Sequence, residues 1–164
     1  MQERYYTDDK NTLILLSLLK AHGIKKVIAS PGTTNIALVA SMMIDPWFEM
    51  YSSVDERSAC YMACGMASES REPVVLTCTG ATASRNYLPG LTEAYYRNLP
   101  ILAITGSHGE DYIGHLHAQS MDRTQAPKDT VVFSSSVKLK DSEWKATIEI
   151  NKAILALSYR GGGP

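Results

Sequence analysis

The sequence is short of the features that mark secreted, membrane-spanning or nucleic-acid-binding proteins. It contains three cysteines, an odd number that argues against a disulfide framework and for a reducing, cytoplasmic compartment. No apolar run approaches the roughly 20 residues that a membrane-spanning helix needs, and the first residues lack signal-peptide character. The formal net charge of −1 gives no electrostatic reason to expect nucleic acid or an anionic membrane as a partner.

The cysteines are also poorly arranged for a metal site. Cys60 and Cys64 lie one helical turn apart, but no third and fourth ligand stands at a suitable spacing from them. We therefore predict no metal-binding residue in this chain. Cys60, Cys64 and Cys78 are interpreted as small core residues.

The 164 residues, 45% of them hydrophobic, are enough for one domain with a substantial core. Apolar periodicity predicts helices over residues 8–22, 36–44, 55–67, 84–97 and 141–157. It predicts extended strands over residues 26–30, 48–53, 74–78, 101–105 and 131–137, and irregular structure with one or two short helices over 108–129. This alternation indicates an α/β fold, a doubly wound parallel sheet covered on both faces, which makes three layers.

The helix that begins near residue 55 is built almost entirely of small and apolar residues. Its small side chains form two neighbouring stripes, namely Ala59, Ala63 and Ala67 on one and Cys60 and Cys64 on the other. Such stripes let another helix approach closely, and we expect them to pack against a second protomer. At the start of this helix, Asp55 is the predicted N-cap and Glu56 is placed to complement the helix dipole.

Ligands of an open parallel sheet collect beyond the carboxyl ends of its strands. Four segments fall at that edge: residues 30–33, 55–57, 79–82 and 106–108. Their glycines permit close backbone approach, and the helix starts offer free N–H groups. None has the spacing of a dinucleotide-binding or P-loop motif, so any one of these turns alone would be an ordinary tight turn.

The order of the segments is more specific than any one of them. Ser-Pro-Gly at 30–32, Asp-Glu-Arg at 55–57 and Thr-Gly-Ala-Thr at 79–82 precede Asn-Tyr-Leu-Pro-Gly at 86–90 and Leu-Pro-Ile-Leu-Ala-Ile-Thr-Gly at 99–106. The series resembles the flavodoxin-like, pyrimidine-binding (PYR) domain of thiamine diphosphate-dependent enzymes, in the superfamily of 2-oxo acid decarboxylases and acetolactate synthase. The Ser-Pro-Gly and Asp-Glu-Arg forms are most similar to those of the menaquinone-pathway synthase, and sulfopyruvate and phosphonopyruvate decarboxylases are close alternatives.

By this resemblance, Glu56 matches the glutamate that hydrogen-bonds N1′ of the cofactor's aminopyrimidine ring. Proton sharing at N1′ favours the imino form of the ring, and a carboxyl group beside an apolar helix seam suits that sharing. The resemblance therefore implies that Glu56 is the catalytic residue and that thiamine diphosphate is the cofactor.

Further positions match the family's segments that face the cofactor. Pro31 and Gly32 match the turn toward it. The turn and helix beside the pyrimidine are matched by a second set: Thr79, Gly80, Thr82 and Asn86. The match is incomplete, because the family's usual Thr-Ser-Gly is here Thr-Gly-Ala at 79–81.

Substrate contacts are implied at one position and altered at another. Gln119 stands where many relatives place an active-site glutamine, so we expect it to meet the substrate. Thr33 and Thr34 replace the Ser-Arg that follows Ser-Pro-Gly in the menaquinone-pathway synthase. The loss of that arginine argues against the same carboxylate-rich substrates.

The family's magnesium-binding Gly-Asp-Gly…Asn motif belongs to a second (PP) domain and does not occur in this sequence. Mg²⁺ and the diphosphate are therefore expected on a PP domain of the same or another chain, within a homodimer or higher homo-oligomer. Gly-Gly-Gly-Pro at 161–164 has a pattern that usually leads from a helix into a strand. We expect residues 1–164 to be a PYR domain truncated before its last strand, and inactive by itself.

The predicted function is the pyrimidine-binding half of a thiamine diphosphate-dependent decarboxylase or carboligase, a lyase or transferase acting on a small-molecule 2-oxo acid. Two alternatives stay open. The chain could be the small subunit of a two-chain sulfopyruvate- or phosphonopyruvate-type decarboxylase. It could also be a non-catalytic flavodoxin-like interaction module, against which the intact Asp-Glu-Arg at 55–57 weighs.

Overall fold

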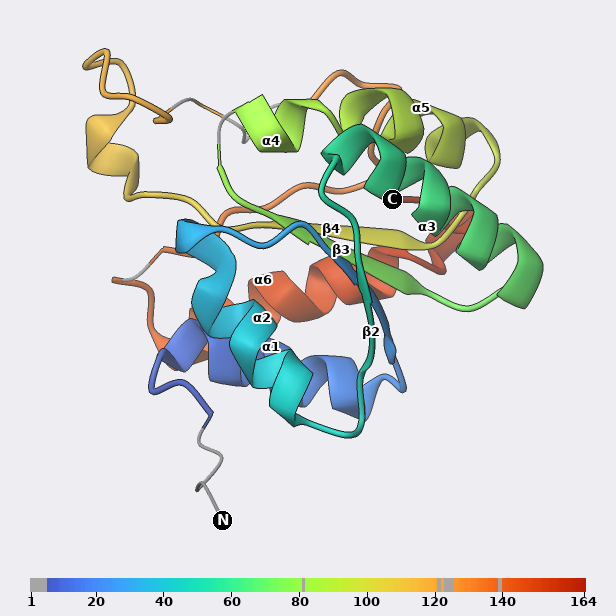
Figure 1. The fold of residues 1–164 in the computed structure, drawn as a ribbon, viewed down its shortest axis with the longest axis horizontal. Helices are drawn as coiled ribbons and strands as arrows, with labels where there is room; N and C mark the ends of the chain where they lie inside the picture. The colour runs from blue at the N-terminus through green and yellow to red at the C-terminus, as the bar shows by residue number, and fades with distance from the viewer. Residues whose placement is uncertain (1–5, 81, 121, 123–125, 139) are drawn as a thin grey trace.

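Helices and strands alternate along the chain in the computed structural model, which describes residues 6–80, 82–120, 122, 126–138 and 140–164 (Figure 1). The helices are α1 Lys10–Ala21, α2 Ile36–Ile44, α3 Glu56–Ser70, α4 Thr82–Arg85, α5 Leu88–Tyr96 and α6 Glu143–Ala156. The strands are β1 Lys26–Ala29, β2 Glu49–Ser52, β3 Val74–Cys78 and β4 Ile101–Thr105. Short 3₁₀ turns occur at η1 Thr33–Asn35, η2 Glu110–Tyr112 and η3 Tyr159–Gly161.

The four strands form one parallel sheet in the order β2-β1-β3-β4. The chain therefore runs from β1 to one neighbour, β2, and then crosses to the other side of β1 to form β3. The connections leave β1 and β3 in opposite directions, which opens a crevice between their carboxyl ends. This switch point is the place where such sheets bind ligands.

Helices cover both faces of the sheet, which gives three layers and confirms the predicted doubly wound α/β fold (Figure 1). On one face, α3 and α5 bury a cluster that includes Cys60, Leu76 and Leu91. On the other face, α1, α2 and α6 bury a second cluster, which includes Leu19 and Ile154. Parallel strands covered on both sides must be apolar throughout, and every residue of β3 is buried.

The predicted strand over residues 131–137 is wrong. Val131 packs against the cluster under α3 and α5, whereas Val137 packs against the cluster under α1 and α6, so the segment passes from one face of the sheet to the other. A strand needs a neighbour for its backbone ladder. Here the N–H of Val132 instead donates to the carbonyl of Pro164, with 2.7 Å between N and O.

The predicted single helix over residues 84–97 is two helices, α4 and α5, separated at Asn86 and Tyr87. Pro89 occupies the second position of α5. Its ring has no N–H and would clash with the carbonyl of Arg85 if one helix continued through. The same proline is well tolerated in the first turn of a new helix, so the chain begins one there.

Small residues let α3 and α5 cross closely. A Cβ placed on Gly90 would lie 2.5 Å from Sγ of Cys60, and the Cys64 thiol lies 3.3 Å from the Gly90 carbonyl oxygen. The two stripes of α3 are thus buried inside this chain, so the expectation that they pack against a second protomer is wrong. The exposed side of α3 carries larger residues, among them Tyr61 and Met62.

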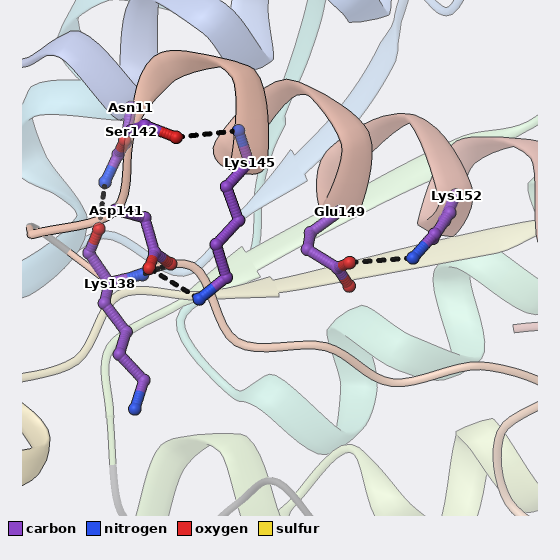
Figure 2. A network of polar contacts seen from close by, with 7 residues as sticks. All are labelled: Asn11, Lys138, Asp141, Ser142, Lys145, Glu149 and Lys152. Carbon is purple, nitrogen blue, oxygen red and sulfur yellow. Dashed lines mark hydrogen bonds and ion pairs between the residues drawn. The ribbon is translucent and has the colours of Figure 1, made fainter.

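Polar contacts fix the start of α6 (Figure 2). Ser142 is the N-cap, and its hydroxyl oxygen accepts the backbone N–H of Lys145 at 3.3 Å. The Lys145 side chain pairs with Asp141 at 2.7 Å, and Asn11 of α1 donates to the Lys138 carbonyl at 3.3 Å. These contacts hold α6 beside α1 on the face opposite α3.

A cavity of about 1160 Å³ lies beside β4, which is an edge strand of the sheet. Its walls include residues 102–106, residues 133–138 and Pro164. Among the residues that the structure describes, no helix is both long enough and apolar enough to cross a membrane.

The close crossing predicts opposite effects for two glycine substitutions. Gly90→Ala is expected to lower the free energy of unfolding by about 1–3 kcal/mol, because the new methyl group would overlap Cys60. Gly65→Ala is the matched control, since Gly65 lies on α3 with no atom within 4 Å of an added Cβ. It should raise the free energy of unfolding by about 0.5–1 kcal/mol. Urea denaturation measures both, and similar effects of the two substitutions would contradict the close crossing.

Candidate functional site

The site begins with Ser30, which follows β1 and joins three strand ends. Its backbone N–H donates to the Thr77 carbonyl on β3 at 2.8 Å. Its hydroxyl donates to the Ser53 carbonyl, just after β2, at 2.7 Å. The start of α3 is thereby held next to the switch point between β1 and β3.

Position 32 requires glycine because there is no room for a side chain, and not because of its backbone conformation. The φ of Gly32 is −169°, which is ordinary extended backbone. However, a Cβ on Gly32 would lie 2.3 Å from Cγ2 of Thr79. The structure therefore brings together two of the predicted cofactor-facing turns, the one at Pro31 and Gly32 and the one that begins at Thr79.

The turn after β4 packs just as closely on the other side of the crevice. A Cβ on Gly106 would lie 2.2 Å from the carbonyl oxygen of Thr34, and the Thr34 hydroxyl donates to the Gly106 carbonyl at 2.8 Å. Backbone thus lies against backbone here. The turns after β1, β3 and β4 are thus in close contact with one another.

The buried side chain of Asn35 forms hydrogen bonds with the turn after β1 and with β3. The sequence does not single out Asn35 as a site residue. Its side-chain oxygen accepts the Gly32 N–H at 2.8 Å, and its Nδ2 donates to Thr77 Oγ1 at 3.2 Å and to the Ser30 carbonyl at 3.3 Å. The residue is 2% exposed. The available signal was an asparagine directly after a Pro-Gly turn, a position where its side chain commonly bonds nearby backbone.

At the start of α3, Asp55 caps the helix and Glu56 does not. Asp55 is the N-cap, as predicted, and its carboxylate accepts the Ser58 N–H at 2.8 Å and the Ser58 hydroxyl at 2.6 Å. These hydrogen bonds lower the pKa of Asp55 below its ordinary value. Glu56, the first residue of the helix, is half-buried, and its carboxyl group has no hydrogen bond or ion pair with any described residue. The helix start is therefore satisfied without Glu56.

Three other predicted cofactor residues lie around the turn after β3. Gly80 is buried, while Thr82 is exposed at the first position of α4. The Asn86 side chain donates to the Thr82 carbonyl at 3.2 Å and so braces the break between α4 and α5. Ala81, within this turn, lies outside the described residues.

The structure does not join Gln119 to these turns. Gln119 is exposed, with a φ of +64°, in a turn closed by the Ser120 N–H and the His117 carbonyl at 3.1 Å. The His117 ring packs on Tyr112, with 4.6 Å between the ring centroids. Within the described part of the chain, no hydrogen bond links Gln119 to the other predicted site residues.

The site offers a carboxyl group and close-packed backbone but no evident metal ligands. Among the described residues, no group of three or more histidine, cysteine, aspartate or glutamate side chains is placed to hold a metal ion. The cavity beside β4 reaches Thr34 and Asn35 but does not include Glu56 or Gly32 in its walls.

Comparison with known protein families identifies the family to which this chain belongs. The model of the thiamine pyrophosphate enzyme N-terminal TPP-binding domain matches residues 11–126. The chain belongs to this family. The predicted resemblance to PYR domains is thus confirmed.

Individual relatives belong to the same class of enzyme. The PYR domain is 35% identical to the 2-succinyl-5-enolpyruvyl-6-hydroxy-3-cyclohexene-1-carboxylate synthase of Bacteroides thetaiotaomicron. The alignment of 162 residues covers 97% of this chain and 29% of that protein. The domain is 35% identical over 153 residues to the synthase of the same name from Porphyromonas gingivalis, covering 91% of this chain and 26% of that protein. The chain therefore spans less than a third of the length of these relatives.

Solved structures share the fold. The thiamine diphosphate-dependent 4-hydroxybenzoylformate decarboxylase of Rhodococcus jostii superposes with a TM-score of 0.81 at 22% identity, over 94% of this chain and 28% of that one. Benzoylformate decarboxylase from Polynucleobacter necessarius gives a TM-score of 0.67 at 21% identity, over 76% and 23% of the two chains. At these identities the likeness establishes the architecture of the PYR domain and not its substrate.

The contact between the turns predicts that a second substitution can restore stability lost by the first. Gly32→Ala is expected to lower the free energy of unfolding by about 1–3 kcal/mol, because its methyl group would overlap Cγ2 of Thr79. Thr79→Ser removes that methyl group and should restore most of the loss when the two changes are combined. Thermal unfolding of the four proteins in a double-mutant cycle measures the coupling. Additive effects would contradict the contact.

Proposed function

We propose that this PYR domain is the pyrimidine-binding half of a thiamine diphosphate-dependent enzyme that decarboxylates or joins 2-oxo acids, with Glu56 as its catalytic carboxyl group. The observation that carries the proposal is the free carboxyl group of Glu56. Asp55 already caps α3, so Glu56 has no part in closing the helix start. It stands instead beside the switch point, where parallel sheets bind ligands.

The surrounding residues fit the aminopyrimidine part of the cofactor. Gly32 packs against the Thr79 side chain and has no room for a side chain of its own, so the turns after β1 and β3 meet closely. The side-chain oxygen of Asn35 accepts the Gly32 N–H and so fixes this amide. When bound, thiamine diphosphate supplies the electron sink for cleaving a 2-oxo acid. The part of Glu56 is to share a proton with the ring nitrogen N1′.

The residues that bind the rest of the cofactor are proposed to lie outside this domain. The described residues offer no metal-binding cluster, so Mg²⁺ and the diphosphate would be held by a PP domain of the same or another chain. The relatives extend well beyond the matched part, which leaves ample length for such a domain. Assembly as a homodimer would use surfaces other than the buried stripes of α3.

The proposed substrate class is based on the names of the relatives, and one difference in sequence from the menaquinone-pathway synthase restricts it further. The relatives named above are carboxylate synthases by name. Thr33 and Thr34 occupy the position of the Ser-Arg of the menaquinone-pathway synthase. We therefore propose a 2-oxo acid donor, with an acceptor that carries fewer carboxylates than that of the synthase.

Glu56→Gln in the full-length protein tests this function. With thiamine diphosphate, Mg²⁺ and a panel of 2-oxo acids, turnover should fall by about 100-fold or more, because an amide cannot share a proton with N1′ as a carboxyl group does. Glu69→Gln, at an exposed position of the same helix, is the matched control and should leave turnover unchanged. Wild-type turnover in Glu56→Gln would refute the proposed role.

A further inference from the structure

The three hydrogen bonds of the buried Asn35 side chain fix the orientation of its amide group. The Gly32 N–H can only donate, so it must meet the Asn35 oxygen, which lies 2.8 Å away. The Ser30 carbonyl can only accept, so it must meet the Asn35 nitrogen, at 3.3 Å. The same nitrogen donates to the Thr77 hydroxyl oxygen at 3.2 Å. The reverse orientation would set donor against donor at Gly32 and acceptor against acceptor at Ser30.

This amide determines which side of the peptide group between Pro31 and Gly32 faces outward. The peptide is trans, so its N–H and its C=O point in opposite directions. The Gly32 N–H points inward to the buried Asn35 side chain, and the Pro31 carbonyl therefore points away from the core. Pro31 is exposed and has no backbone N–H of its own. On their outer side, Pro31 and Gly32 thus offer a carbonyl oxygen and no donor.

The outer side of this turn borders the crevice between the carboxyl ends of β1 and β3. Glycine-containing turns at such strand ends often bind phosphate groups through outward-facing N–H groups. The Gly32 N–H does not serve in this way, because it is already bonded to Asn35. A carbonyl oxygen repels phosphate and carboxylate oxygens and accepts hydrogen bonds from N–H and O–H groups. The turn at Pro31 and Gly32 therefore favours an uncharged part of a ligand over an anionic one.

We propose that Asn35 is a positioning residue that holds the turn at Pro31 and Gly32 with its carbonyl, and not its N–H, toward the crevice. The turn then meets the aminopyrimidine end of the ligand and not its phosphates. This inference rests on the proposed function for the identity of that ligand, thiamine diphosphate. Loss of the Asn35 oxygen would free the Gly32 N–H to turn outward and would leave the ligand-facing side of the turn without a fixed orientation.

Hydrogen exchange resolved to single amides in the full-length protein tests the orientation of this peptide. In wild type, the Gly32 amide should exchange slowly both without ligand and with thiamine diphosphate and Mg²⁺, because its partner is Asn35 and not the ligand. In Asn35→Ala its exchange should be faster by about 10-fold or more, since an amide without its hydrogen bond loses protection. A Gly32 amide that is unprotected in free wild type, or that exchanges equally in Asn35→Ala, would overturn the proposal.

The matched control is Thr77→Val. This substitution removes another hydrogen bond of the Asn35 side chain but leaves the bond to Gly32 in place. The exchange rate of the Gly32 amide should therefore stay that of wild type. Faster exchange of this amide in Thr77→Val, equal to that in Asn35→Ala, would show a general loosening of the turn and would contradict the assigned role of the Asn35 oxygen. The wild-type exchange decides the orientation even if Asn35→Ala does not fold.

Cofactor affinity separates a positioning role from a purely structural one. The dissociation constant of thiamine diphosphate, measured with Mg²⁺ by calorimetry on the full-length protein, should rise by about 10-fold or more in Asn35→Ala. Thr77→Val also removes a buried hydrogen bond and should lower the thermal midpoint, yet its dissociation constant should equal that of wild type. An unchanged constant in Asn35→Ala, or an equal rise in both variants, would overturn the positioning role.

The outcomes also distinguish this proposal from the proposed function. If Glu56→Gln is inactive while Asn35→Ala binds thiamine diphosphate as wild type does, only the role of Asn35 fails. If Glu56→Gln is fully active, the proposed function fails. The exchange of the Gly32 amide without ligand then still decides whether Asn35 holds this N–H inward.

Discussion

The turns after β1 and β3 touch at a point where no side chain fits, since a Cβ on Gly32 would lie 2.3 Å from the Thr79 methyl group. The rest of the site depends on this contact. It lies where the connections from β1 and β3 diverge, so it forms the floor of the crevice. Asn35 holds the Gly32 amide, and Ser30 ties the same turn to the residue after β2. The start of α3 is fixed through these bonds.

Two adjacent carboxyl groups stand at the start of α3, and they are engaged differently. Asp55 is fully engaged in capping α3 through Ser58, which leaves Glu56 free. An acidic residue in the first turn of a helix ordinarily needs no further explanation. Here its position at the switch point, and the membership of the chain in the thiamine pyrophosphate enzyme family, favour a role toward the cofactor ring.

Features governed by local chemistry could be predicted from the sequence. Alternating apolar segments indicated the parallel three-layer fold, and Asp55 was recognisable as an N-cap because capping depends on a few adjacent residues. Features governed by tertiary contacts could not. The run at 131–137 is β-branched like a strand, but no strand lies beside it to complete a ladder. The small stripes of α3 signalled close approach correctly, yet periodicity cannot tell whether the partner is α5 or another chain. Asn35 was missed because its importance lies in the groups that its side chain contacts, which only the folded structure shows.

The central claim is that Glu56 meets N1′ of the aminopyrimidine ring. The most direct measurement compares turnover by full-length wild type and Glu56→Gln with thiamine diphosphate and with an analogue that carries C–H in place of N1′. If the two groups are in contact, replacing N1′ should lower turnover by about 100-fold or more in wild type and have little effect in Glu56→Gln, because the interaction is already lost. An equal loss in both proteins would contradict the account.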